Sequence, residues 1–176
     1  MTSHTISVLV ENEFGVLARV AGLFSGRGFN IESLTVNEDP LDPTVSRIVL
    51  VTFGDDQIVE QINKQLNKLV SVIKVADFKD VETLEREMVI VKVAVDERTR
   101  SELDSIVAAF RAHVIDIGPR AITVELTGDS EKIKAFIAIV RPLGIKEVVR
   151  SGKVAMARSV QLSHDNHQSR RAREAE

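Results

Sequence analysis

Residues 11–36, ENEFGVLARVAGLFSGRGFNIESLTV, decide the fold because the spacing of hydrophobic residues changes twice within them. Just before this stretch, residues 5–10 alternate apolar and polar positions, the period of two expected for a half-buried strand. From Val16 to Phe24 the apolar side chains recur with helical spacing, and the glycines that follow end the helix. Residues 29–36 return to a strand pattern. The stretch therefore predicts a strand–helix–strand unit.

The rest of the first half completes a βαββαβ order. Residues 45–53 read as a strand, joined to the preceding one by NEDPLDPT, whose two Asp-Pro steps suit a hairpin loop. Asp55 is expected to cap a helix that carries apolar residues from Ile58 to Leu69, and residues 70–78 supply a fourth strand.

The second half repeats this order. Its expected strands are residues 88–95, 114–117, 122–126 and 145–149, and its helices carry apolar sets at Leu103–Ile106–Val107–Phe110 and Ile133–Phe136–Ile137–Val140. Gly128-Asp129 opens the last helix just as Gly54-Asp55 opened the second one. Two tandem ferredoxin-like βαββαβ sandwiches, an α+β fold, are the simplest account. We expect an N-terminal domain at 1–79, a linker at 80–87, a C-terminal domain at 88–158 and a polar tail at 159–176.

Composition excludes several classes of function. The chain has 176 residues, 44% of them hydrophobic, and a formal net charge of −3, so no basic field is available for nucleic acid. No apolar run is long enough to cross a bilayer, and the N-terminal residues lack a signal-peptide pattern. The absence of cysteine excludes disulfides and thiolate chemistry. We therefore expect a cytoplasmic protein without membrane or nucleic-acid partners.

The turn into the first helix is a candidate binding site for a small carboxylate. At Gly15 the chain enters the helix, so the amides of Gly15, Val16 and Leu17 include donors without an intrahelical acceptor, and the helix dipole adds partial positive charge. Glycine at this position also leaves room for a ligand to approach the backbone.

Two asparagines and three aliphatic residues extend this candidate site. Asn12 ends the first strand and Asn30 begins the second, and their amides suit a group with a carboxylate and an ammonium. Val16, Leu17 and Ile31 can line a pocket for a branched aliphatic side chain. Taken singly, each residue is better explained as a turn or core residue. Only their joint placement around one helix N-terminus favours a ligand, and the residues alone leave the two interpretations in balance.

Catalytic and metal chemistry find little support. The four histidines, His4, His113, His164 and His167, do not form a cluster, and no metal site is expected. The chain has neither a P-loop nor a convergent set of nucleophile, base and oxyanion donors. An open sheet of this kind does need its edge paired, which favours side-by-side dimerisation.

The chain resembles the regulatory, or small, subunits of acetolactate synthase (acetohydroxyacid synthase), which begin with an ACT domain. The resemblance covers residues 5–158 and rests on VENEFGVLARVAGLFSGRGFNIESLTV, DPTVSRIVLVTFGDD, QINKQLNKLVSVIKV, REMVIVKV, IVAAFRAHVIDIGP and VVRSGKVAMAR. It implies a non-catalytic protein that binds and activates a catalytic subunit and confers feedback inhibition by valine or a related branched-chain amino acid. Thiamine diphosphate, magnesium and FAD are then expected on the catalytic partner and no cofactor on this chain.

The resemblance also implies where the effector binds. The family's site lies at the interface of an ACT-domain homodimer, which here corresponds to Asn12, Gly15, Val16 and Leu17 of one chain, with Asn30 and Ile31 approaching from the partner side. Two alternatives remain: an amino-acid-sensing ACT module that serves another partner, and a small enzyme on a ferredoxin-like fold.

Overall fold

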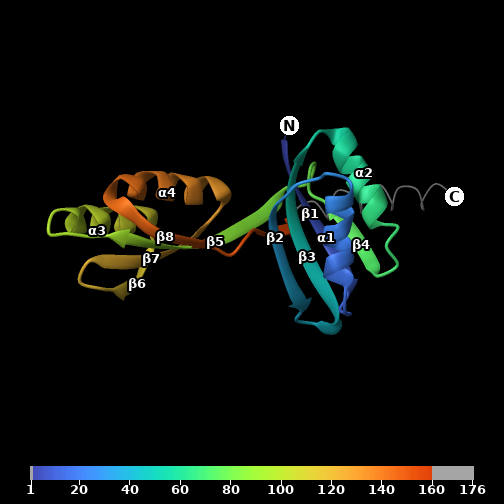
Figure 1. Cartoon of the computed structure of the whole chain (residues 1–176), viewed down its shortest axis with the longest axis horizontal. Coiled ribbons are helices and arrows are strands. Elements are labelled where there is room, and N and C mark those ends of the chain that lie inside the picture. The colour runs from blue at the N-terminus through green and yellow to red at the C-terminus, as the bar shows by residue number, and fades with distance from the viewer. Residues whose placement is uncertain (1, 160–176) are drawn as a thin grey trace, which may run out of the picture. The chain divides into compact units, whose positions relative to one another are not determined.

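The computed structural model describes residues 2–159, which form two compact units (Figure 1). Within the described residues, the first unit comprises 2–84 and 155–159, and the second is Glu85–Val154. Each unit has its own hydrophobic core. The tail expected at 159–176 lies, except for its first residue, outside the described residues.

The first unit is a four-stranded antiparallel sheet with two helices. Its elements are β1 (Thr2–Glu11), α1 (Val16–Gly26), β2 (Ile31–Asp39), β3 (Asp42–Gly54), α2 (Asp56–Leu66) and β4 (Val72–Asp77). The strand order is β2-β3-β1-β4, so β2 and β4 are the edges. This arrangement confirms the predicted βαββαβ order and the ferredoxin-like fold.

The core of the first unit follows from the strand period and the helical spacing. Ile6 of β1 lies opposite Leu50 of β3, and Val8 lies opposite Ile48, so one face of the sheet is aliphatic. From α1, the buried residues are Val16, Val20 and Phe24, which recur every four positions. The helix therefore packs on the sheet through a single stripe and leaves its opposite flank exposed.

The second unit repeats the same plan. Its elements are β5 (Thr83–Ala94), α3 (Thr99–Phe110), β6 (His113–Ile117), β7 (Ala121–Gly128), α4 (Ser130–Gly144) and β8 (Ile145–Arg150), and the strand order is β6-β7-β5-β8. Phe110 and Phe136 meet edge to face in its core, with ring centroids 5.4 Å apart.

Both helix caps predicted from Gly-Asp pairs are confirmed. The carboxylate of Asp55 accepts a hydrogen bond from the amide of Ile58, and that of Asp129 accepts one from the amide of Lys132. The two halves of the chain thus use the same chemistry to start the same helix.

The hairpin expected at residues 37–44 is confirmed, but its loop is shorter than expected because the strands extend through most of these residues. β2 continues to Asp39 and β3 begins at Asp42. The two aspartates close the turn themselves: Asp39 Oδ1 accepts from the amide of Leu41, and Asp42 Oδ1 accepts from the amide and the hydroxyl of Thr44. The hydrogen bonds from the side chain and the backbone of Thr44 lower the pKa of the Asp42 carboxyl.

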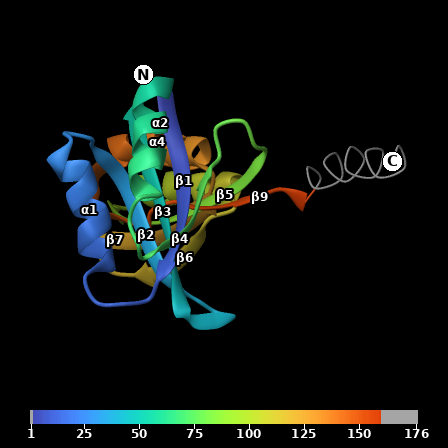
Figure 2. The same cartoon turned by 90° about the vertical axis from the view of Figure 1, so that its right-hand side faces the viewer.

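The segment expected as a linker, residues 80–87, is largely strand, since β5 begins at Thr83. A further strand that the sequence did not predict, β9 (Val154–Ala157), pairs with β5 (Figure 2). The amide of Arg158 donates to the carbonyl of Glu82 over 2.9 Å, next to this pairing. The first part of β5 and the whole of β9 are strands because they pair with each other. They lie about seventy residues apart in the chain.

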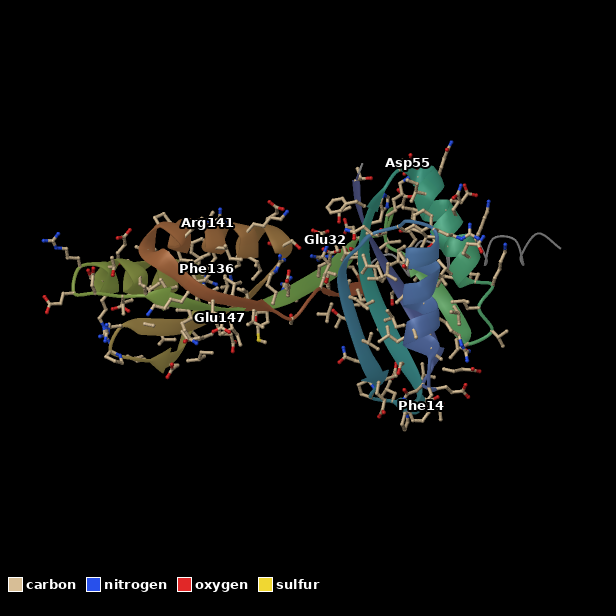
Figure 3. All side chains as sticks on the ribbon, in the orientation of Figure 1. Phe14, Glu32, Asp55, Phe136, Arg141 and Glu147 are labelled. Carbon is tan, nitrogen blue, oxygen red and sulfur yellow. The ribbon has the colours of Figure 1, made fainter. Side chains whose placement is uncertain are left out.

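Replacing Phe136 by alanine should destabilise the chain by about 3–5 kcal/mol, because a fully buried aromatic ring is removed from the core of the second unit. Figure 3 shows Phe136 between α4 and the sheet. Urea unfolding followed by circular dichroism measures the loss. Ile139→Ala on the same helix is the control, since Ile139 is half exposed and should change the unfolding free energy by less than about 1 kcal/mol. Equal losses for the two variants would contradict this description of the core.

Candidate functional site

A groove of about 950 Å³ lies where β1 passes into α1. It is lined by Asn12, Glu13, Phe14, Gly15, Leu17, Ala18 and Ala21. Figure 3 shows Phe14 at this end of the first unit, with its side chain directed away from the sheet. The sequence predicted Asn12, Gly15 and Leu17 at this place, and the structure brings all three to the groove.

Gly15 sets the shape of the turn. Its φ of +81° lies in the left-handed region, and it occupies the position that precedes α1. A Cβ atom built on Gly15 would meet no heavy atom within 4 Å. The backbone conformation, rather than crowding, therefore favours glycine here, and the space beside it is open to a ligand.

The start of α1 presents backbone donors to the groove. No side chain caps this helix, in contrast to the aspartate caps of α2 and α4. The amide of Val16 makes a long hydrogen bond of 3.4 Å to the carbonyl of Glu13, and the amides of Gly15 and Leu17 have no hydrogen-bond acceptor among the described residues. Uncapped amides and the helix dipole together favour an anionic group at this point.

Asn12 is held in a fixed orientation beside the turn. Its Nδ2 donates to the carbonyl of Pro43 over 2.9 Å and to Oε2 of Glu38 over 3.3 Å. The backbone amide of Asn12 also donates to the carbonyl of Thr44 over 2.7 Å. Because Nδ2 is engaged, Oδ1 is the atom that Asn12 can offer to a ligand, and it suits an ammonium group.

The apolar side of the groove comes from the exposed flank of α1. Leu17 is 41% exposed and Phe14 is fully exposed. Ala18 and Ala21 also line the groove, and their small side chains leave it open. Val16 is not part of this wall: its side chain is 4% exposed and packs in the core. Of Val16, only the backbone amide remains in the candidate site.

Asn30 and Ile31 lie at the other end of the same unit. β1 and β2 both run antiparallel to β3, so they are parallel to each other, and Ile31 is level with His4 rather than with Asn12. The 11-residue helix α1, about 16 Å long, separates the two ends. The expectation that all six residues gather around one helix N-terminus is therefore wrong within a single chain.

Asn30 nevertheless keeps a free amide. Its carbonyl accepts a hydrogen bond from the hydroxyl of the buried Thr52 over 2.7 Å, which fixes the backbone. The side chain of Asn30 is exposed and forms no hydrogen bond among the described residues. It is thus available to a group outside the chain.

Two lining residues, Ala18 and Ala21, were not singled out from the sequence. The signal was present in the helical spacing. Val16, Val20 and Phe24 form the buried stripe, so positions 17, 18 and 21 must face away from the core. Taking all apolar residues from Val16 to Phe24 as one stripe places Leu17 and Ala21 with the buried residues, which the structure corrects.

The described residues contain neither a metal-ligand cluster nor a membrane-spanning helix. They contain no group of three or more His, Asp or Glu side chains that could hold a metal ion. His4 is buried in β1 and His113 lies in β6 of the other unit, whereas His164 and His167 lie outside the described residues. Within residues 2–159, no helix combines the length and the hydrophobicity needed to cross a bilayer.

Comparisons with known proteins match both halves of the chain. The family described as the AHAS small subunit-like ACT domain matches residues 6–74, and the family described as the small subunit of acetolactate synthase matches residues 86–159. A protein from Methanothermobacter thermautotrophicus named "Probable acetolactate synthase small subunit" is 52% identical over 89% of this chain and 93% of its own length. The acetolactate synthase small subunit of Aquifex aeolicus is 43% identical over 94% of this chain and 86% of its own length.

A solved structure agrees with these relatives. The crystal structure of the acetolactate synthase small subunit from Thermotoga maritima matches with a TM-score of 0.81 and 40% sequence identity. The match covers 90% of this chain and 98% of that one. The likeness therefore extends over both units and not over the N-terminal domain alone.

Proposed function

The chain belongs to the acetolactate synthase small-subunit family, and from that premise we propose that it binds and activates the catalytic subunit and makes it sensitive to valine. The thiamine diphosphate chemistry then belongs to the catalytic partner, and this chain supplies regulation. The related branched-chain amino acids leucine and isoleucine are the other candidate effectors.

The observation that carries the proposal is the groove between Asn12 and Ala21. Its uncapped amides at Gly15 and Leu17 suit the carboxylate of an amino acid, and Oδ1 of Asn12 suits its ammonium group. Leu17 and the two alanines offer an apolar surface to a branched side chain. Valine has these three groups and no other polar atoms that would need partners.

A second copy of the chain would complete the site. β2 is an edge strand, and its residues Leu34 and Val36, together with Leu17 of α1, are each more than a third exposed. These three residues, here named the edge strip, run along the flank of α1 and β2. An apolar surface beside an open sheet edge is typical of a protein–protein interface.

Two-fold symmetry would then bring the separated residues together. If two β2 strands pair antiparallel, the start of one lies against the end of the other. The end of β2 lies beside Asn12, because Glu38 contacts its side chain. Asn30 of the partner subunit, which precedes the partner's β2, would therefore reach the groove of this chain. The same pairing would cover the open side of the groove.

Inhibition would act through linkage. Valine bound between two subunits stabilises the arrangement that has the better-formed groove, and it shifts the holoenzyme toward that arrangement by at most its difference in affinity. A dissociation constant between about 1 μM and 1 mM would let the site follow a metabolite pool.

Asn30→Ala should weaken valine binding by about 1–3 kcal/mol, because polar atoms of the ligand would lose their partner. Inhibition of the reconstituted holoenzyme by valine measures the change. The control is Gln61→Ala, which removes an exposed side-chain amide elsewhere, on α2. This variant should leave inhibition by valine unchanged. Unchanged inhibition in the Asn30 variant would remove this residue from the site.

The test of the proposed function is reconstitution with the catalytic subunit. We expect the chain to raise the rate of acetolactate formation and valine to lower it again. A rate that this chain does not change, at concentrations well above those of the catalytic subunit, would contradict the proposal.

A further inference from the structure

A second cavity, of about 240 Å³, lies on the opposite flank of α1. It is lined by Val16 and Arg19 of α1 and by residues 68–72, which lead from the end of α2 into the first residue of β4. At 3.6 residues per turn, Val16 and Arg19 point about half a turn away from Leu17 and Ala21, which line the first groove. The two cavities are therefore separate.

Two cationic side chains line this cavity. Arg19 and Lys68 both belong to it, and neither forms an ion pair with any carboxylate of residues 2–159. The chain as a whole carries a formal charge of −3, so two unpaired cations at one cavity are a local excess of positive charge. Such a place attracts anions.

The guanidinium of Arg19 is held in position. Its Nη1 donates to Oγ of Ser71 over 3.0 Å, and Ser71 is only 4% exposed. The carbonyl of Ser71 in turn accepts from the amide of Glu11 over 2.9 Å, so this residue is tied to the end of β1. One end of the planar guanidinium is thus fixed, and its other donors remain for a planar, bidentate acceptor such as a carboxylate.

The remaining walls are aliphatic. Val16 is buried, Leu69 and Val72 are partly buried against the core, and Val70 is almost fully exposed. A fully exposed valine beside a cavity is an apolar surface that a ligand can cover. The cavity therefore has positively charged side chains on one side and aliphatic side chains on the other. Its volume suits only a small molecule.

We propose that the cavity at Arg19, Lys68 and Ser71 binds a small monocarboxylate with a short aliphatic chain. Arg19 and Lys68 receive the carboxylate, and Val16, Leu69 and Val70 contact the chain. No carboxylate side chain lines this cavity, and the hydroxyl of Ser71 already accepts from Arg19, so an ammonium group, which the first groove needs in its ligand, would face two cations here. The second site therefore selects simple carboxylic acids over amino acids.

A titration of the ¹⁵N-labelled full chain with isobutyrate tests the proposal, followed through the amide resonances of Ser71 and Val72. We expect saturable shifts with a dissociation constant on the order of 1 mM, and none with isobutyramide, the uncharged analogue of the same shape. Arg19→Gln and Lys68→Gln should each weaken isobutyrate binding about tenfold or more. Arg100→Gln, which removes an exposed arginine from α3 with the same change in charge, should bind as the parent does.

Several results would overturn the proposal. These are no saturable shift up to about 50 mM isobutyrate, equal binding of isobutyramide, or unchanged binding in the Arg19 variant. Shifts confined to residues 12–15, Ala18 and Ala21, which line only the first groove, would place the ligand there instead. Inorganic phosphate that binds here while isobutyrate does not would show an anion site without the aliphatic preference, and would also overturn it. The proposed valine site is unaffected by any of these outcomes, since it uses the other flank of α1.

Discussion

Gly15→Asp is expected to abolish inhibition by valine, raising the valine concentration needed for half inhibition by about 100-fold or more. The new carboxylate would stand at the uncapped amides where the carboxylate of valine is proposed to bind. It would both occupy these donors and repel the ligand. The left-handed backbone at residue 15 strains any side chain, but a Cβ here meets nothing within 4 Å and aspartate adopts a positive φ more readily than most residues, so we expect the variant to fold with some loss of stability.

The matched control for this substitution is Gly15→Asn. Asparagine has the shape of aspartate and accepts the same backbone conformation, but it carries no charge. It should therefore lose far less valine sensitivity than the aspartate variant, and both variants should still activate the catalytic subunit. Full valine sensitivity in Gly15→Asp would show that the effector binds elsewhere.

Leu34→Asp is expected to weaken self-association of the chain by about 100-fold or more. Leu34 lies in the middle of the edge strip, and two-fold symmetry would place two such aspartates at one interface, so both the apolar contact and the charge balance would be lost. Sedimentation equilibrium of the free chain measures the change. Valine binding should fall in parallel, because the proposed site needs Asn30 of the partner subunit.

Leu41→Asp is the control for the edge-strip variant. Leu41 is also an exposed leucine, 95% accessible, but it lies at the tip of the β2–β3 hairpin and outside the edge strip. It should associate as the parent does, and urea unfolding of both variants should show intact folding. Equal association of the parent and Leu34→Asp would contradict the proposed dimer surface.

Most of the fold could be predicted from the sequence, because it is governed by local patterns. The period of two in β1, the four-residue spacing in α1 and the Gly-Asp helix starts each depend on neighbours in the sequence. β9 and the first part of β5 could not be predicted in this way. They are strands only because they pair with each other, and no local pattern reports a partner so distant in the chain.

The candidate site likewise has one part that local sequence predicts and another part that depends on the topology. Asn12, Gly15 and Leu17 are close in sequence and lie together in the groove. Asn30 and Ile31 are placed by topology: the helix between two parallel strands returns the chain to the opposite end of the sheet. Spacing in the sequence cannot reveal this separation, although the element order implies it.

Calorimetric titration with L-valine, run on the parent chain and on the Gly15→Asp variant, decides whether the groove at Gly15 binds the effector. We expect saturable heat for the parent chain and none for the variant. Valine that binds both chains equally, or that binds neither even with the catalytic subunit present, would contradict it.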